Sequence, residues 1–174
     1  RFWANFRLMR WHPRIILVTG SSGKTTLLNL IESQVGDKAH YSHEANSSFG
    51  IPFDILGLRR HTLMPWEWLL LFLLAPLKAF FPPYPQKLYI VEADCDRPHE
   101  GKFLSLWLKP EVTLWVSLSK THSMNFPEPV ESNIAHEFGY FIEHTQSLVI
   151  VNGDNQHIAT QLPRTRAKVI KIFL

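Results

Sequence analysis

Apolar runs recur along the chain and alternate with segments of helical periodicity. A continuous run such as RIILVTG, which ends in glycine, is typical of a strand buried on both faces. Five such runs lie at residues 14–20, 87–92, 112–117, 148–152 and 169–173. Helices are predicted between them at residues 25–34, 101–108, 130–144 and 155–161. This alternation predicts an α/β fold with a mostly parallel sheet and helices on both faces.

One segment breaks the alternation, because residues 63–81 (LMPWEWLLLFLLAPLKAFF) are almost wholly apolar. Their uninterrupted core, residues 68–77, is far shorter than the roughly 20 apolar residues of a membrane-spanning helix. We therefore exclude a spanning helix and expect an apolar insertion at about residues 63–85. Three interpretations remain: a buried helix, which we favour, a helix in the membrane interface, or a surface that docks another domain.

Residues 1–13 form a basic and aromatic segment. The first fourteen residues contain four arginines and no acid, and Phe2, Trp3, Phe6 and Trp11 stand between the arginines. We favour a helix that packs on its own domain over one that lies on a membrane surface or covers a partner. No apolar stretch with a cleavage site follows the arginines, so a secretion signal is not expected.

Composition narrows the class of protein. The 174 residues are 45% apolar and 19% charged, as in a folded globular domain. The net charge of +3 is too small to indicate a nucleic-acid partner. Cys95 is the one cysteine, which excludes an intramolecular disulfide and a zinc site made of several thiolates. We therefore expect a reducing, cytoplasmic compartment.

A glycine-rich segment, TGSSGKTT at residues 19–26, stands between the first predicted strand and the first predicted helix. In such a loop, main-chain N–H groups bind phosphate oxygens, the lysine reaches the terminal phosphates and a threonine hydroxyl binds Mg²⁺. We predict a nucleotide site formed by Gly20, Ser21, Ser22, Gly23, Lys24, Thr25 and Thr26. Lys24 would be catalytic and Thr25 a metal ligand. An ordinary glycine-rich turn is the alternative, and it explains neither Lys24 nor the paired threonines.

The segment TGSSGKTT resembles the nucleotide loop of the Mur ligase family, the ATP-dependent enzymes that build the peptidoglycan stem peptide. Four further stretches are similar to family segments in the same order: EANSSFGIP at 44–52, IVEADCDRPHE at 90–100, KPEVTLWVSLSKTHSMNF at 109–126 and VIVNGDN at 149–155. The resemblance covers residues 14–173 and implies the central ATP-binding domain, with a P-loop-like fold. The nearest branch is the one that adds D-alanyl-D-alanine to a UDP-muramoyl tripeptide.

The resemblance also implies roles for residues outside the loop. Glu92 would hold Mg²⁺, and His122 would be catalytic and bind a second metal ion. Asn46, Ser47 and Ser48 would contact the substrate, while Asn152 and Asp154 would contact ATP. From the residues alone, Glu92 fits a buried structural carboxylate as well, and Asn152 and Asp154 fit a turn around Gly153. Asp94, Asp96 and Arg97 fit either a magnesium site or a solvated turn.

The implied reaction joins an acid to an amino acid or dipeptide through an acyl phosphate, with ATP and Mg²⁺ as cofactors and ADP as a product. The family's other two domains, for the UDP-sugar and for the incoming amine, are expected outside residues 14–174. They would belong to another chain or to a longer protein, so this chain alone is expected to bind ATP without completing ligation. No guanine-recognition motif NKxD occurs, which disfavours a GTPase.

One departure from the family affects its second metal site. The family carries a modified lysine on the helix after the histidine loop, and Phe138 occupies that position here. Either His136 or Glu137 substitutes for the lysine, or the second site is missing. This departure favours an alternative function, a catalytically impaired nucleotide-binding module that docks a partner or the inner membrane face.

Overall fold

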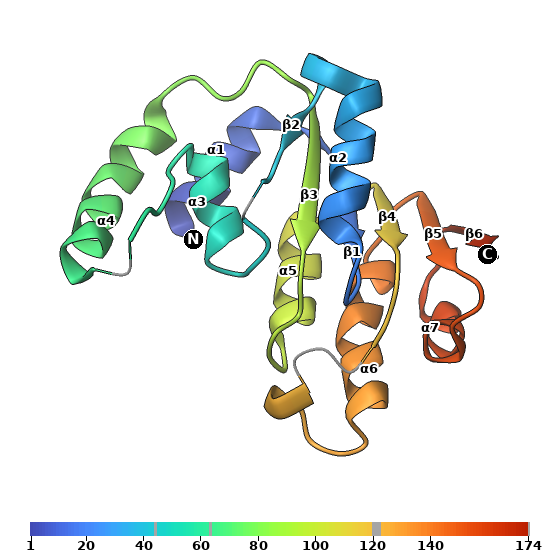
Figure 1. Cartoon of the computed structure of the whole chain (residues 1–174). Helices are drawn as coiled ribbons and strands as arrows, with labels where there is room; N and C mark the ends of the chain where they lie inside the picture. The colour runs from blue at the N-terminus through green and yellow to red at the C-terminus, as the bar shows by residue number, and fades with distance from the viewer. Residues whose placement is uncertain (44, 63, 120–122, 174) are drawn as a thin grey trace.

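A single sheet of six parallel strands organises the computed structural model, which describes residues 1–43, 45–62, 64–119 and 123–173 (Figure 1). The strands are β1 (Arg14–Thr19), β2 (His40–Tyr41), β3 (Leu88–Ala93), β4 (Val112–Trp115), β5 (Leu148–Asn152) and β6 (Lys168–Ile172). Their order is β2-β3-β1-β4-β5-β6, so β1 pairs with both β3 and β4. The predicted α/β fold is confirmed, and each of the five apolar runs contains a strand.

Seven α-helices connect these strands in the described part of the chain. They are α1 (Phe2–Trp11), α2 (Lys24–Val35), α3 (Gly50–Leu56), α4 (Pro65–Phe80), α5 (Glu100–Leu108), α6 (Val130–Glu143) and α7 (Gln156–Gln161). Short 3-10 helices lie at Gly36–Lys38, Ser123–Asn125 and Leu162–Arg164. The four helices predicted between the strands all form. The sequence analysis did not predict α3 or the two-residue strand β2.

The core lies on both faces of the sheet, because residues along β1 alternate between them. Leu17 belongs to the larger apolar cluster, which is shared with α1 and with α3 to α7. Val18 belongs to a smaller cluster under α2, together with Leu28 and Ile90. Figure 1 shows α2 on one face of the sheet and α5 and α6 on the other. The helices thus cover both faces, as the continuous apolar strands require.

Helix α1 packs against its own domain, as expected. It lies between α4 and the sheet, beside α3 (Figure 1). Arg7 on its inner side is buried and donates hydrogen bonds to the carbonyl oxygens of Leu56 (2.8 Å), Lys78 (2.9 Å) and Pro82 (3.2 Å). One arginine of α1 therefore satisfies main-chain carbonyls at the ends of α3 and α4.

The expectation of a buried helix at residues 63–81 is wrong. Helix α4 forms there, but only the strip made by Glu67, Leu71, Ala75 and Ala79 is buried. The helix lies at the edge of the molecule, where α1 and α3 cover one side of it and leave most of its large apolar side chains exposed. Within the described residues, no helix is long and apolar enough to cross a membrane.

Candidate nucleotide-binding site

The glycine-rich loop joins the end of β1 to the start of α2, as the sequence predicts. Gly20 and Gly23 have φ angles of +137° and +81°, a region that favours glycine. A Cβ atom on Gly20 would lie 2.8 Å from the main-chain N and O atoms of Ser117. Both positions therefore need glycine, which allows the loop to turn closely against the segment after β4.

Ser117 anchors the loop from that segment. Its Oγ accepts a hydrogen bond from the Ser22 N–H (2.9 Å) and donates one to the Ser22 carbonyl oxygen (2.8 Å). The Ser21 Oγ donates to the Ser119 carbonyl (3.2 Å) and accepts from the Ser119 N–H (2.9 Å). The sequence analysis did not assign Ser117 or Ser119 to the site, because no local pattern records contacts between residues almost 100 positions apart.

Lys24, the first residue of α2, is held inside the site. Its Nζ donates to the Gly20 carbonyl oxygen (2.6 Å) and forms an ion pair with the Asp94 carboxylate (2.8 Å). The Lys24 and Asp94 side chains are 8% and 9% exposed, so the ion pair is largely desolvated. The sequence left the roles of Asp94, Asp96 and Arg97 open, and the structure shows that Asp94 contacts Lys24. The N–H of Asp96 donates instead to Glu100 at the start of α5.

Thr25 and Glu92 meet next to this ion pair. The Thr25 Oγ1 donates to Glu92 Oε2 over 2.8 Å, which joins the start of α2 to the carboxyl end of β3. Thr25 is exposed, whereas Glu92 is 6% exposed and its main-chain N–H donates to the Ser42 Oγ. A hydroxyl and a carboxylate, both oxygen donors, side by side at a phosphate loop suit Mg²⁺. Thr26, the next residue of α2, is also exposed.

Asn46 and Ser47 approach the site from a loop before α3. The Asn46 carbonyl accepts a hydrogen bond from the Asp94 N–H (2.8 Å), so this loop lies against the end of β3. The Ser47 Oγ accepts from the Gly50 N–H (3.1 Å), and the Ser48 N–H donates to Glu100 (2.9 Å). The structure thus places the predicted substrate segment beside Asp94, and therefore beside the residues that surround Lys24.

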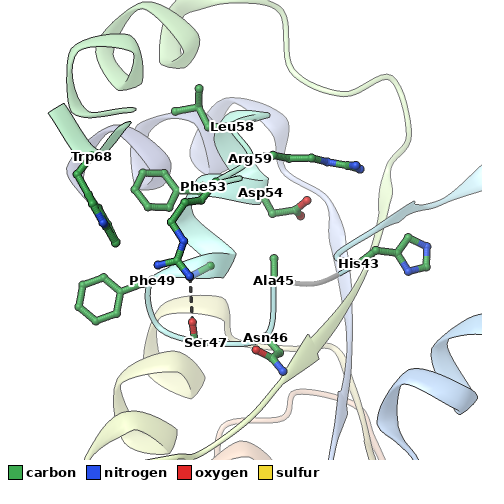
Figure 2. A pocket seen from close by; sticks show the side chains of 12 residues that line it. His43, Ala45, Asn46, Ser47, Phe49, Phe53, Asp54, Leu58, Arg59 and Trp68 are labelled. Atoms are coloured by element: carbon green, nitrogen blue, oxygen red, sulfur yellow. Dashed lines mark hydrogen bonds between the residues drawn. The ribbon is translucent and has the colours of Figure 1, made fainter. Parts of the chain in front are cut away.

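A cavity of about 230 Å³ opens beside this loop (Figure 2). Asn46 and Ser47 line it together with Phe49 and Trp68, and two arginines, Arg59 and Arg60, add positive charge. The sequence analysis missed both arginines. They follow α3 and come close to Asn46 only because the chain folds back there. The cavity therefore adds an aromatic and cationic wall to the predicted substrate segment.

Asn152 and Asp154 lie at the end of β5, which β4 separates from β1. The Asn152 Oδ1 accepts a hydrogen bond from the Asp154 N–H over 2.9 Å. This bond closes a turn around Gly153, which is the alternative role that the sequence left open for the two residues. A neighbouring asparagine connects this turn to the segment after β4, since Asn155 Nδ2 donates to the Leu118 carbonyl (3.1 Å). Their assignment to ATP stays a prediction. His122 lies outside the described residues.

Phe138 is a core residue of α6. It is 2% exposed, and its ring packs against Trp115 with the ring centroids 5.9 Å apart. The neighbouring Glu137 is buried and accepts a hydrogen bond from the Gly101 N–H (3.2 Å), while His136 contacts Tyr140. Neither side chain is paired with Thr25 or Glu92. Among the described residues, no group of three histidine, cysteine or carboxylate side chains is arranged to hold a metal ion.

Cys95 follows Asp94 and is buried in the larger apolar cluster. Burial raises the pKa of its thiol well above the ordinary value, and nearby carboxylates, Glu137 first among them, act in the same direction. The thiol is therefore protonated near neutral pH and does not serve as a nucleophile.

The Lys24–Asp94 ion pair gives the first testable prediction. Asp94 stabilises Lys24 in the free protein, and ATP must draw the lysine away from it. Asp94→Asn keeps the shape of the side chain but removes this competition, so we expect ATP to bind about three- to tenfold more tightly. Calorimetric titration with ATP and Mg²⁺ measures the change. Asp37→Asn, at an exposed carboxylate beyond α2, is the control. Unchanged or weaker binding by Asp94→Asn would contradict the competition.

Known proteins resemble the chain in sequence pattern and in fold. A family model described as the Mur ligase middle domain matches residues 18–173. A crystal structure of MurF from Acinetobacter baumannii is similar with a TM-score of 0.72 and 16% identity, over 97% of this chain and 33% of that one. The UDP-N-acetylmuramate:L-alanyl-gamma-D-glutamyl-meso-diaminopimelate ligase from Neisseria meningitides has a TM-score of 0.60 and 19% identity, over 97% and 48%. The chain therefore spans less than half the length of these structures. No curated protein sequence matches it.

Proposed function

The chain belongs to the Mur ligase middle-domain family, and we propose that it is the ATP-binding domain of an ADP-forming ligase of peptidoglycan precursor synthesis. The observation that carries this proposal is the joint position of Lys24, Thr25 and Glu92 at the glycine-rich loop. Lys24 pairs with Asp94 over 2.8 Å in the free protein and would exchange this partner for phosphate, and the Thr25 hydroxyl lies 2.8 Å from the Glu92 carboxylate. These three residues supply the charge and the oxygen ligands that ATP and Mg²⁺ need.

The proposed reaction has two steps. A substrate carboxylate oxygen attacks the γ-phosphorus of ATP, the bond to the β-phosphate oxygen breaks, and ADP leaves. The amine of the second substrate then attacks the carbonyl carbon of the acyl phosphate. Phosphate departs with the electron pair of the broken C–O bond, and the nitrogen loses a proton to form the amide. Neither step needs a nucleophile from the protein.

Positioning and charge are the contributions that this chain makes to the proposed reaction. The loop N–H groups orient the phosphates, and Lys24 stabilises negative charge on the transferring group after it leaves Asp94. Thr25 and Glu92 would hold Mg²⁺, which neutralises charge on the phosphate oxygens when bound. This arrangement accelerates phosphoryl transfer by alignment and electrostatics.

We propose that the cavity beside Asn46 receives part of the acceptor, a UDP-muramoyl peptide. The acceptor carries phosphates and carboxylates, and Arg59 and Arg60 supply cations on the cavity wall. One structural neighbour is named as a ligase of D-alanyl-D-alanine, and we propose the same kind of incoming amine here. The domains that bind the sugar nucleotide and the amine are proposed to lie outside these 174 residues. His122, Asn152 and Asp154 stay proposed site residues.

Glu92→Gln tests the proposed magnesium ligand. Glutamine keeps the size of the side chain but removes its charge, so we expect ATP affinity measured with Mg²⁺ to fall at least about tenfold. Affinity measured with EDTA should change less than about twofold, because the loop and Lys24 are intact. Glu111→Gln is the control, since Glu111 pairs with Arg14 before β4. An equal loss with and without Mg²⁺ would contradict the assignment of Glu92 to the metal.

Hydroxylamine trapping tests the ligase proposal, because an acyl phosphate reacts with hydroxylamine to give a hydroxamate. We expect ADP and the hydroxamate of a UDP-muramoyl tripeptide only when chain, ATP, Mg²⁺ and tripeptide are all present. D-alanyl-D-alanine should not yield an amide product until the other domains are supplied. ATP consumption that does not depend on the tripeptide would contradict the proposal.

A second candidate function is a nucleotide-binding module without ligation, and the burial of Phe138 favours it. A phenyl ring in the core replaces the metal-binding lysine that the resemblance implies, so the second metal site of the family lacks that ligand. Magnesium-dependent ATP binding without any hydroxamate, also when the other domains are supplied, would support this candidate over the ligase.

A further inference from the structure

Helix α4 presents a broad apolar surface to solvent. Its outward side chains are spaced by three or four residues, so they share one side of the helix opposite Leu71 and Ala75. We call this surface the α4 face, and its members, which are 47% to 63% exposed, are Trp66, Leu69, Leu70, Leu73, Leu77 and Phe80. Contiguous exposed apolar surface of this kind marks a site of interaction in soluble proteins.

The α4 face contains no charged side chain, and cations border it. Lys78 lies 5.5 Å from the Phe81 centroid, just past the end of the helix. Arg10 of α1 donates to the Ala79 carbonyl over 2.8 Å. Cations that stand beside aromatic rings at the margin of an apolar surface are typical of groups that sit at the polar boundary of a lipid bilayer.

Charge is distributed unevenly between this part of the molecule and the rest. Residues 1–14 and 57–87 together contain eight of the 18 lysines and arginines but one of the 15 acids, which gives them a net charge of +7. The remaining residues have a net charge of −4, in agreement with the total of +3. The one acid, Glu67, is 6% exposed and accepts hydrogen bonds from the His61 and Thr62 N–H groups. Two of the cations do not contribute to the surface around α4, because Arg7 is buried and Arg14 pairs with Glu111. The exposed charge that remains there is positive.

We propose that the α4 face binds an anionic lipid surface, with α4 lying parallel to the membrane plane. The 16-residue helix is about 24 Å long, too short to span a bilayer and long enough to rest in its interface. Apolar side chains enter the acyl region, and the bordering cations contact lipid phosphates. A second copy of this chain is disfavoured as the occupant, because a symmetric dimer would bring the cations beside one α4 face close to those beside the other.

The position of α4 is compatible with this orientation. Figure 1 shows α4 at one end of the molecule, with α1 and α3 between it and the sheet, while β6 forms the opposite edge. The glycine-rich loop belongs to β1 and α2 and contributes no residue to the α4 face. Lipid binding and nucleotide binding therefore use separate residues, and each can be tested while the other is intact.

Vesicle flotation tests the proposal directly. The chain is mixed with vesicles of phosphatidylcholine alone, or with about one third phosphatidylglycerol, at low and at high salt. We expect at least about tenfold more protein with the anionic vesicles at low salt, and a clear loss of binding at high salt. The triple variant Leu69→Ser, Leu73→Ser and Leu77→Ser should lose at least about 90% of this binding. Replacing Arg10 and Lys78 with serine should weaken binding to anionic vesicles and leave binding to phosphatidylcholine vesicles unchanged.

A matched variant separates the α4 face from exposed apolar surface in general. Leu30, Leu106 and Ile172 are 59%, 44% and 52% exposed on other elements, and their joint replacement with serine should leave flotation unchanged. Thermal melting followed by circular dichroism checks that each variant is folded. Absence of flotation by the unmodified chain, or equal flotation by the α4 variant, would overturn the proposal. The proposal would also be overturned if the unmodified chain formed a dimer and bound no vesicles, and the α4 variant were a monomer. The α4 face would then bind a second copy of the chain.

Discussion

Replacing Lys24 with alanine is expected to weaken ATP binding at least about 100-fold. Lys24 is the cation at the glycine-rich loop that can reach the terminal phosphates, and each charge-assisted hydrogen bond contributes about 1.5–3 kcal/mol. Loss of two such bonds corresponds to about 3–6 kcal/mol, which exceeds a factor of 100 in Kd. Asp94, left without its partner, adds repulsion toward the phosphates. Calorimetric titration with ATP and Mg²⁺ measures the loss.

The same substitution also affects the fold, so its control needs care. Lys24→Ala leaves Asp94 buried without a cation, which typically costs about 3–5 kcal/mol when the carboxylate stays ionised. The double variant Lys24→Ala with Asp94→Ala removes both charges and should melt close to the unmodified chain while still failing to bind ATP. Lys102→Ala, at an exposed lysine of α5, should change neither property. A folded double variant with normal ATP affinity would contradict the assignment of the loop.

Phe138→Ala is expected to lower the free energy of unfolding by about 3–5 kcal/mol, the usual cost of a large cavity in an aromatic core. The Phe138 ring is 2% exposed and lies between Trp115 of β4 and Phe141 of α6. If the ring lay at the surface instead, shortening the side chain would change stability little. Urea unfolding followed by tryptophan fluorescence and circular dichroism measures the difference.

Phe72→Ala provides the matched control, since this phenylalanine of α4 is 63% exposed. Its loss should cost less than about 1 kcal/mol, because most of the ring is already in contact with water. A similar cost for Phe138→Ala and Phe72→Ala would contradict the placement of Phe138 in the core.

Strands were the most predictable part of this fold. Residues 14–20 and 87–92 are apolar at successive positions because β1 and β3 are central parallel strands that are covered on both faces. The run at 169–173 forms the edge strand β6, and most of its side chains are exposed. Helix α7 was predictable from its cap, since the Asn155 Oδ1 accepts the Ile158 N–H at its first turn. The two-residue strand β2 carries too few side chains to produce a pattern.

Contacts across the sheet were less predictable. The sequence places Lys24 and Glu92 at the ends of their elements, and the parallel order of β1 and β3 then brings those ends together. It does not indicate that Asp94 pairs with Lys24 or that Arg59 and Arg60 reach the cavity beside Asn46. These contacts depend on the direction of each side chain and on the path of the chain after α3. Neither can be predicted from the local pattern of apolar and polar residues.

Helix α4 illustrates a different limit of sequence reasoning. Its composition predicts a helix that avoids water, and the favoured interpretation was burial in the core. Composition cannot say how many neighbours the fold supplies, and here α1 and α3 cover only the side marked by Leu71, Ala75 and Ala79. The uneven charge around α4 was visible in the sequence, but its meaning depends on which side of the helix is exposed.

One measurement tests the central claim most directly: calorimetric titration of the unmodified chain with ATP, in the presence of Mg²⁺ and in the presence of EDTA. We predict binding of one ATP per chain, tighter with Mg²⁺ by at least about tenfold, because Thr25 and Glu92 supply the metal ligands beside Lys24. Absence of ATP binding in the presence of Mg²⁺ would contradict the account, since the loop would then be a structural turn.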